Sequence, residues 1–194
     1  MDCRNRHHPR GLIRPLAQQP GTRQNACLLS GLRLVDGLIT IDRCTVTKQT
    51  VMVRGTGSAI RNSTLTGGSL TVSATDQGTF TRNVFDAFPM GLSNDSRRNL
   101  VQANVFKNLA TAGLGAAETF LPQDANTIED NEFTGNDIGL SSSSMLRHII
   151  VRRNVFNGNN TAGHLIWAPP GTVADGGGNQ GPCGSTPTPN PDLT

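Results

Sequence analysis

A six-residue phrase centred on asparagine recurs along this chain at nearly constant spacing. The phrase is an apolar residue, two variable residues, asparagine, one variable residue and phenylalanine. Two earlier copies carry Cys44 or Ser63 in place of the asparagine and an aliphatic residue in place of the phenylalanine. The central residues are 44, 63, 83, 104, 131 and 154, so the steps are 19, 20, 21, 27 and 23 residues. Such steps are typical of a solenoid whose coils are constant and whose loops vary.

A second landmark follows the phrase in three of the coils, where glycine precedes leucine at Gly91-Leu92, Gly113-Leu114 and Gly139-Leu140. Each coil therefore contains three short apolar segments separated by turns, and none of the segments is long enough for a helix. The chain has 22 glycines, seven phenylalanines and no tyrosine. This composition favours short strands broken by tight turns.

Stacking explains why the phrase repeats. A single coil cannot bury its apolar face, so neighbouring coils stack about 4.8 Å apart and align Ile, Phe and Leu in columns. Asparagine tolerates the left-handed backbone of a sharp turn, and its amide can bond to the asparagine one coil away. The sequence therefore predicts one buried column containing Asn83, Asn104, Asn131 and Asn154.

The longer phrase Asn131-Glu-Phe133-Thr-Gly-Asn136-Asp-Ile-Gly139-Leu140 resembles the parallel β-helix repeat of the pectin-lyase-like superfamily. The resemblance covers about residues 37–179. It implies an all-β fold, a right-handed parallel β-helix of roughly six to seven coils. We expect an irregular N-terminal arm at residues 1–26, the β-helix at 27–179 and a disordered Pro/Thr-rich linker or tail at 180–194.

Charge is distributed unevenly. Residues 1–33 carry six arginines and one acid, whereas the remainder holds 11 basic and 13 acidic residues. A nucleic-acid binder normally places its basic stripe on the folded body, so we expect no nucleic-acid partner. We interpret the arm as a solvated tail, with a polyanion-binding arm as the alternative. No apolar run approaches the roughly 20 residues of a membrane span, so we expect no membrane partner.

The Pro/Thr-rich tail is typical of linkers between modules of secreted proteins, so we expect a secreted or cell-surface location. No leader is recognisable at the start of the sequence. Two explanations stay open, namely a protein that is not exported and a sequence whose native start is missing.

Polysaccharide chemistry is what the resemblance implies, with the site on the sheet that begins at the Gly-Leu pair. An acid or a metal ligand would come from Asp95, Glu118 or Asp124. Arg97 and Arg98 would hold uronate carboxylates, and Trp167 would stack on a sugar ring near His164. The alternative is that these are solvated loop residues, with His164 and Trp167 capping the last coil.

The function expected from this resemblance is a module that binds or processes an extracellular polysaccharide, as a lyase, hydrolase or epimerase would. A lyase needs a base and a cation or basic residue, and a hydrolase needs two carboxylates. No cofactor is evident, although a divalent cation such as Ca²⁺ would suit a lyase. The alternative is a non-catalytic structural or adhesive rod, a fragment of a longer secreted protein, and the sequence does not decide whether the chain is an enzyme.

Two further expectations concern single residue types. Cys44 occupies the asparagine position of its coil, which predicts a buried free thiol, and Cys183 lies too far along the rod to pair with Cys27 or Cys44. A link from Cys27 to Cys3 or to Cys44 stays open. The charged residues that flank the asparagine column are expected to compensate one another along a side face. They are Arg61, Arg82, Arg152 and Arg153 with Asp42, Glu129 and Asp130.

Overall fold

The computed structural model describes residues 23–25, 28–29, 38–73, 75–93, 96–116, 124–142, 149–160 and 173–181. In these ranges the chain forms twenty short strands, β1 to β20, and every strand pair is parallel. No helix within these ranges is long and apolar enough to cross a membrane.

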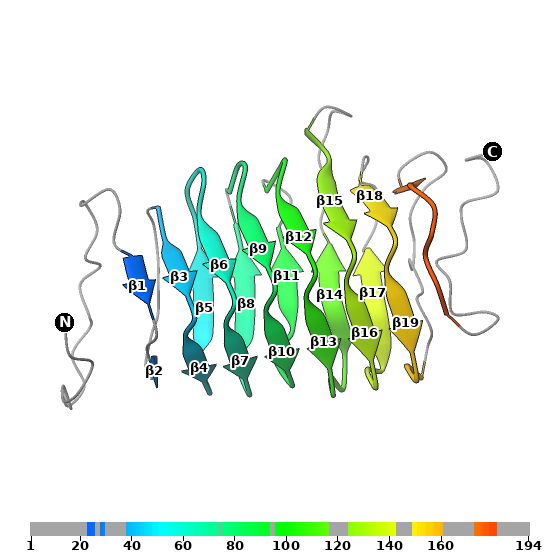
Figure 1. Ribbon diagram of the computed structural model, residues 1–194, viewed down its shortest axis with the longest axis horizontal. Helices are drawn as coiled ribbons and strands as arrows, with labels where there is room; N and C mark the ends of the chain where they lie inside the picture. The colour runs from blue at the N-terminus through cyan, green and yellow to red at the C-terminus, as the bar shows by residue number, and fades with distance from the viewer. Residues whose placement is uncertain are drawn as a thin grey trace.

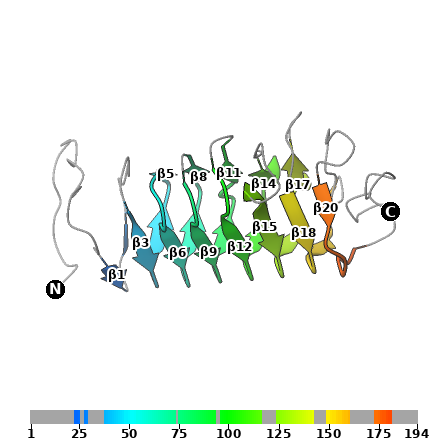
Figure 2. The same cartoon turned by 90° about the horizontal axis from the view of Figure 1, so that it is seen from above.

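The strands form three parallel sheets that run the length of the molecule (Figures 1 and 2). Sheet A contains β1 (Arg23–Asn25), β3 (Thr40–Asp42), β6 (Ala59–Arg61), β9 (Thr79–Thr81), β12 (Leu100–Gln102), β15 (Asn126–Glu129), β18 (Ile149–Arg152) and β20 (Val173–Asp175). Sheet B contains β2 (Leu28–Leu29), β4 (Thr45–Thr47), β7 (Thr64–Thr66), β10 (Val84–Asp86), β13 (Val105–Lys107), β16 (Glu132–Thr134) and β19 (Val155–Asn157). Sheet C contains β5 (Thr50–Val53), β8 (Ser69–Val72), β11 (Met90–Leu92), β14 (Ala112–Ala116) and β17 (Ile138–Ser142).

The chain passes through the sheets in the order A, B, C and then returns to sheet A in the next coil. This path is the predicted parallel β-helix, and the coils stack in a row along the long axis (Figure 1). Five coils have all three strands described, from β3–β5 to β15–β17, with partial coils at both ends. The count is slightly lower than the predicted six to seven because no sheet C strand is described in the first and last turns.

The core is a set of columns, one inward residue per strand and coil. In sheet B the column runs through Val46, Leu65, Phe85, Phe106, Phe133 and Phe156, all at most 1% exposed. The last four rings stack almost parallel, with centroid separations of 4.7, 5.0 and 4.9 Å. The phenylalanine of the repeated phrase therefore packs on its own equivalent in the next coil, as the sequence predicted.

The asparagine column lies at the corner between sheets A and B and is confirmed as a buried ladder. The backbone N–H of Asn104 donates to Asn131 Oδ1 at 2.9 Å, and Asn104 Nδ2 donates to the same oxygen at 3.0 Å. Asn104 Nδ2 also donates to the carbonyl of Phe80 at 2.8 Å. The same pattern joins Asn83 to Asn104 and Asn131 to Asn154. Each buried amide is thereby paired, which is what makes a polar column tolerable inside a β-helix.

The residue before each ladder position turns the chain sharply from sheet A to sheet B; we call this turn the A–B corner. It adopts a left-handed backbone conformation without being glycine, which is uncommon. The φ angles lie between 51° and 57° at Arg43, Asn62, Arg82, Ala103, Asp130 and Arg153.

Cys44 differs from the expectation of a free thiol. Its side chain is buried and disulfide-bonded. Cys3, Cys27 and Cys183 all lie outside the described residues. The ladder position accepts a cysteine because the hydroxyl of Ser63, one coil further on, takes the hydrogen bond from the Cys44 N–H at 3.1 Å.

Candidate functional site

The turns that lead from sheet C back to sheet A, the C–A turns, carry the predicted Arg97, Arg98 and Asp124. Two buried hydroxyls anchor these turns to the coil before. Thr75 Oγ1 donates to the carbonyl of Val53 at 3.2 Å, and Ser96 Oγ donates to the carbonyl of Val72 at 2.8 Å. The turns are therefore tied to sheet C at fixed points.

A second, shorter asparagine ladder runs through Asn99 and Asn126, where two of the C–A turns enter sheet A. The N–H of Gly78 donates to Asn99 Oδ1 at 2.8 Å, and the N–H of Asn99 donates to Asn126 Oδ1 at 3.0 Å. Asn126 Nδ2 donates a hydrogen bond to the carbonyl of Ser96, in the preceding C–A turn, at 2.9 Å. Both asparagines are buried, so the residues immediately before them are held in register from coil to coil.

Asp76 and Arg98 form the tightest ion pair on the C–A turns. Arg98 Nε donates to Asp76 Oδ1 at 2.7 Å, and Arg98 Nη2 contacts Asp76 Oδ2, which makes the contact bidentate. Hydrogen bonds from Arg98, followed by the positive charges of Arg98 and Arg97, hold the pKa of Asp76 below its ordinary value of 3.8. Asp76 is therefore a carboxylate that stays ionised rather than a proton donor.

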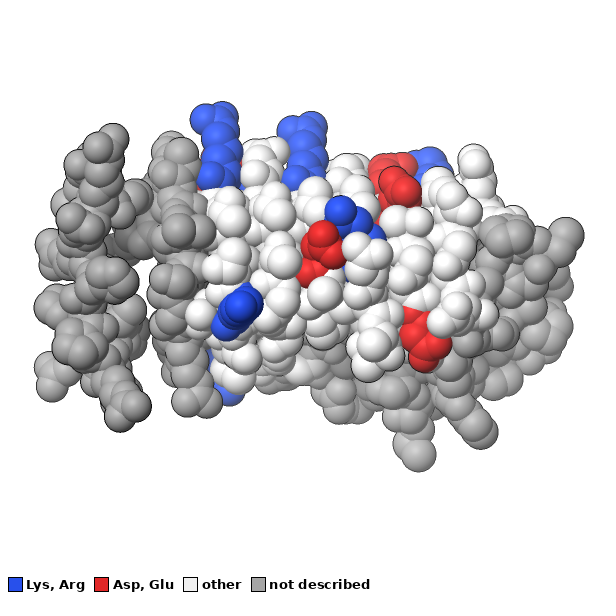
Figure 3. Space-filling model, turned by 90° about the horizontal axis from the view of Figure 1, so that it is seen from below, with Lys and Arg blue, Asp and Glu red and all other residues white. Residues whose placement is uncertain are grey.

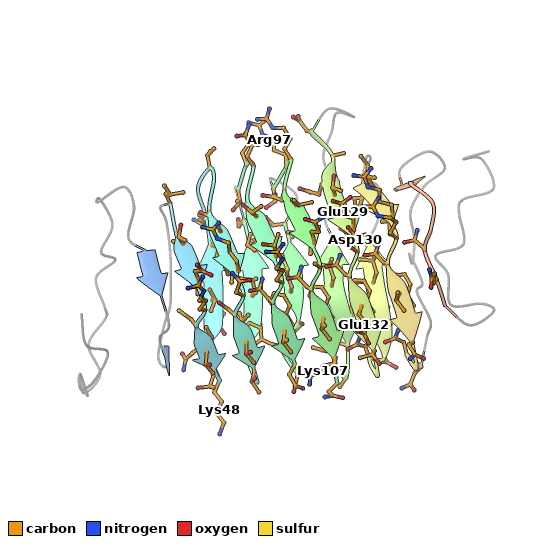
Figure 4. The ribbon with its side chains drawn as sticks, in the orientation of Figure 1. Lys48, Arg97, Lys107, Glu129, Asp130 and Glu132 are labelled. Carbon is orange, nitrogen blue, oxygen red and sulfur yellow. The ribbon has the colours of Figure 1, made fainter. Side chains whose placement is uncertain are left out.

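Arg97 lies between two carboxylates from different coils. Its guanidinium is 3.6 Å from Asp76 and 3.9 Å from Asp124, and its side chain is 51% exposed. Asp124 is also 3.9 Å from Arg98, but its own side chain is only 14% exposed. Figure 4 shows Arg97 projecting from the turn at the upper edge of the ribbon. The arrangement points guanidinium groups outward and keeps the carboxylates beneath them.

The outer face of sheet C, next to these turns, is small and uncharged. Its five strands contain no ionisable residue. One half-buried row crosses the face in register and consists of Met52, Thr71, Gly91, Gly115 and Ser141. A hydrolase on this face would need two carboxylates about 5 to 9.5 Å apart, and the strands themselves supply none.

The glycines of sheet C fall into two kinds. A Cβ at Gly139 would lie 2.7 Å from Cδ1 of Phe156, so Gly139 is required by the phenylalanine column. A Cβ at Gly91 or Gly115 would meet its nearest atom at 3.9 or 3.8 Å, which is ordinary contact. Neither of these two residues has a positive φ. The fold itself would therefore accept a side chain at both positions.

Of the seven predicted site residues, the structure brings together Arg97, Arg98 and Asp124. The other four, Asp95, Glu118, His164 and Trp167, lie outside the described residues. Within the described ranges, no three His, Cys, Asp or Glu side chains converge in a way that could hold a metal ion.

Sequence reasoning missed Asp76, the main partner of Arg98. A signal for it exists, because Asp76, Arg97 and Asp124 each stand four residues before the inward residue of the next sheet A strand. Aligning the C–A turns on those inward residues would have placed the three charges on adjacent coils.

Comparison with known proteins supports the architecture. Residues 31–173 match a family model described as a right handed beta helix region, which is most of the chain. No curated protein and no solved structure shows significant similarity to the sequence.

Proposed function

Because this chain belongs to the right-handed β-helix family, we propose that it is a module that binds an extracellular polysaccharide on the outer face of sheet C. The observation that carries the proposal is that two glycines at the centre of that face, Gly91 and Gly115, are required neither by packing nor by backbone conformation. Glycine inside a strand loses about 0.5 to 1 kcal/mol relative to alanine, and it commonly marks a site that a ligand approaches closely.

The neighbours of these glycines suit a carbohydrate. The hydroxyls of Thr71 and Ser141 lie in the same row and offer donors and acceptors to sugar hydroxyls. Arg97 stands on the adjoining C–A turn with half of its side chain exposed, where its fork can bind a carboxylate of an acidic sugar. In this proposal Asp76 and Asp124 hold Arg97 in place, and Arg98 holds Asp76. His164 and Trp167 would extend the contact.

Binding is favoured over bond cleavage for two reasons. The described carboxylates of the C–A turns lie 3.9 Å or less from arginine nitrogens, and the strands of sheet C supply no others. An extracellular setting is supported by the disulfide of Cys44, since disulfides persist mainly in oxidising compartments. We also propose that a divalent cation such as Ca²⁺ assists the binding of the polysaccharide.

Valine substitution of the two glycines tests the proposal. Gly91→Val and Gly115→Val should fold normally, because the added Cβ fits and valine favours strands. Each should weaken polysaccharide binding about ten-fold, measured by calorimetric titration across a panel of neutral and acidic polysaccharides. Thr66→Val, at a half-buried position on the outer face of sheet B, is the matched control and should bind as the wild type does.

Three further measurements complete the test. Arg97→Gln should weaken binding of acidic polymers while leaving neutral polymers unaffected, and titration in EDTA checks the cation. Wild-type affinity in both glycine variants would overturn the site on sheet C. Release of reducing ends or unsaturated sugars from a bound polymer would identify an enzyme instead, and Asp95, Glu118 and Asp124 would then be the first residues to replace.

A further inference from the structure

Charged side chains follow the A–B corner from coil to coil, and the two ends of the molecule differ. Toward the C-terminal end the charges are compensated, as the sequence predicted. Arg153 is 2.7 Å from Asp130 and 3.0 Å from Glu129, and Arg152 is 2.5 Å from Glu129. Gln102 adds amide hydrogen bonds to both carboxylates at 3.0 and 3.2 Å.

Toward the N-terminal end the compensation is missing, which corrects the expectation for Arg61 and Arg82. Arg43, Arg61 and Arg82 are exposed, and none forms an ion pair with a carboxylate in the part of the chain that the structure describes. Asp42 is the register partner of Arg61 on the neighbouring strand, but it accepts a hydrogen bond from Asn62 Nδ2 at 2.8 Å and no ion pair joins it to that arginine. In Figure 3 basic side chains project from the upper edge over the first described coils, whereas acidic and basic atoms meet further toward the C-terminal end.

Backbone bonds place the three arginines on consecutive coils. The N–H of Arg43 donates to the carbonyl of Arg61 at 3.1 Å, and the N–H of Asn62 donates to the carbonyl of Thr81, the residue before Arg82, at 3.1 Å. Consecutive coils are about 4.8 Å apart. The result is a row of positive charges parallel to the long axis, which we call the arginine ridge.

The backbone of the ridge makes arginine an unexpected choice. Arg43 and Arg82 have φ angles of 55° and 56°, a region that asparagine and glycine occupy more easily. Asn62 fills the same position in the coil between them, at φ 51°. Arg153 has this conformation too, but there the ion pair with Asp130 explains why an arginine occupies the position. Strained positions without an internal partner are typical of functional surfaces.

We propose that the arginine ridge binds a linear acidic polysaccharide, carboxylated or sulfated, that lies parallel to the solenoid axis. Arginine forks bind such oxyanions in bidentate fashion, and the exposed hydroxyls of Thr45 and Thr64 beside the ridge suit a hydroxyl-rich polymer. The phenylalanines of the described coils are buried, so these coils offer no exposed phenylalanine on which nucleic-acid bases could stack. The exposed large apolar residues of the described coils are Leu38 and Val155, which is too little for a membrane-binding face.

The ridge is separate from the surface proposed for sheet C. Each coil runs through sheets A, B and C in turn, so the A–B corner is the one corner that sheet C does not border. Arg97 and the two glycines can therefore fail as a binding site without affecting the ridge, and the reverse also holds.

Charge removal on the full chain tests the ridge. The variant Arg43→Asn/Arg61→Gln/Arg82→Asn removes three charges and puts asparagine at the two left-handed positions, where it is favourable. Lys48→Asn is the matched control, because Lys48 is exposed and left-handed at φ 52° but lies at the turn from sheet B to sheet C. The probes are heparin for sulfate and polygalacturonate for carboxylate, each titrated over a series of NaCl concentrations. The basic residues of the N-terminal arm are the same in all variants.

The triple variant should bind one or both polymers about ten-fold more weakly, with a shallower dependence of affinity on salt. Lys48→Asn should stay within about two-fold of wild type. The charge-retaining variant Arg43→Lys/Arg61→Lys/Arg82→Lys should recover most of the binding. Unchanged affinity in the triple variant, an equal loss in Lys48→Asn, or tighter binding to single-stranded DNA or phosphatidylserine vesicles than to both polysaccharides would each overturn the proposal.

Discussion

The ring of Phe106 lies 5.0 Å from that of Phe133, with an angle of 8° between their planes. Both side chains are fully buried, and each comes from the same position of its coil. The contact between coils is therefore made by identical groups, which makes the interior of this β-helix sensitive to the loss of any one ring.

Truncating one ring should be costly. Phe106→Ala removes a ring that stacks on Phe85 and Phe133, and should lower the free energy of unfolding by about 3 to 5 kcal/mol. Thr45→Ala, at an exposed position of sheet B, should change it by no more than about 0.5 kcal/mol. Urea denaturation of both variants checks the difference, and equal effects would contradict the buried column.

The asparagine ladder should be as sensitive as the ring column. Asn131→Ala would leave the N–H and the side-chain amide of Asn104 without their acceptor, and the carbonyl of Val101 without its donor. Each unsatisfied buried group costs about 1 to 3 kcal/mol, so we expect a loss of roughly 3 kcal/mol or more. Asn157→Ala, at an exposed strand position, is the control. A loss at position 131 no larger than at position 157 would show that the ladder contributes no stability.

The ion pair between Asp76 and Arg98 should give a pH-dependent contribution to stability. Because the pKa of Asp76 in the folded protein is below 3.8, the contribution is present above about pH 4 and disappears as the pH falls through the folded pKa. Asp76→Asn should lower the free energy of unfolding at pH 7 by up to about 1 kcal/mol, since Arg98 is partly exposed. The gap to wild type should close as the pH falls through the folded pKa of Asp76. Denaturation curves for both proteins across this range check the sign.

The disulfide of Cys44 should involve Cys27. Asn25 pairs with Asp42 and Leu28 pairs with Thr45, so the register on either side makes Cys27 the expected partner. Neighbouring parallel strands are about 4.8 Å apart, within the range of Cα separations that a disulfide spans. Peptide mapping without reduction checks the link. A peptide that joins Cys44 to Cys183 would contradict the extended solenoid.

The fold could be predicted from the sequence because the same sequence motif recurs once in each coil. Asn83, Asn104, Asn131 and Asn154 recur with their phenylalanines at coil spacing, and no helix or sandwich repeats in that way. The shorter ladder of Asn99 and Asn126 was missed. Those asparagines stand two residues before the inward residue of a sheet A strand, and Gly78 and Ser58 take the same position in other coils and hide the repeat.

The candidate site was predicted less completely than the fold because its residues are not repeated. Arg97, Arg98 and Asp124 were named from loop composition, but their pairing depends on which turns lie side by side. Asp76 was missed because its role depends on the turn beside it, where Asp76 and Arg97 pair in parallel on neighbouring coils. The compensation expected for Arg61 and Arg82 was wrong for a related reason, since like charges can occupy one corner on successive coils.

The asparagine ladder has a direction. Backbone N–H groups at Ser63, Asn83, Asn104 and Asn131 each donate to the side-chain oxygen of the following coil, never to that of the preceding one. Each coil thus supplies the acceptor for the N–H of the coil before it, and its own N–H needs an acceptor from the coil after it. Length is consequently a modular property: duplicating residues 84–104 in tandem would add one rung with every donor still matched to an acceptor. Deleting a partial coil would break the series at that level, so this architecture should change in size only by whole turns.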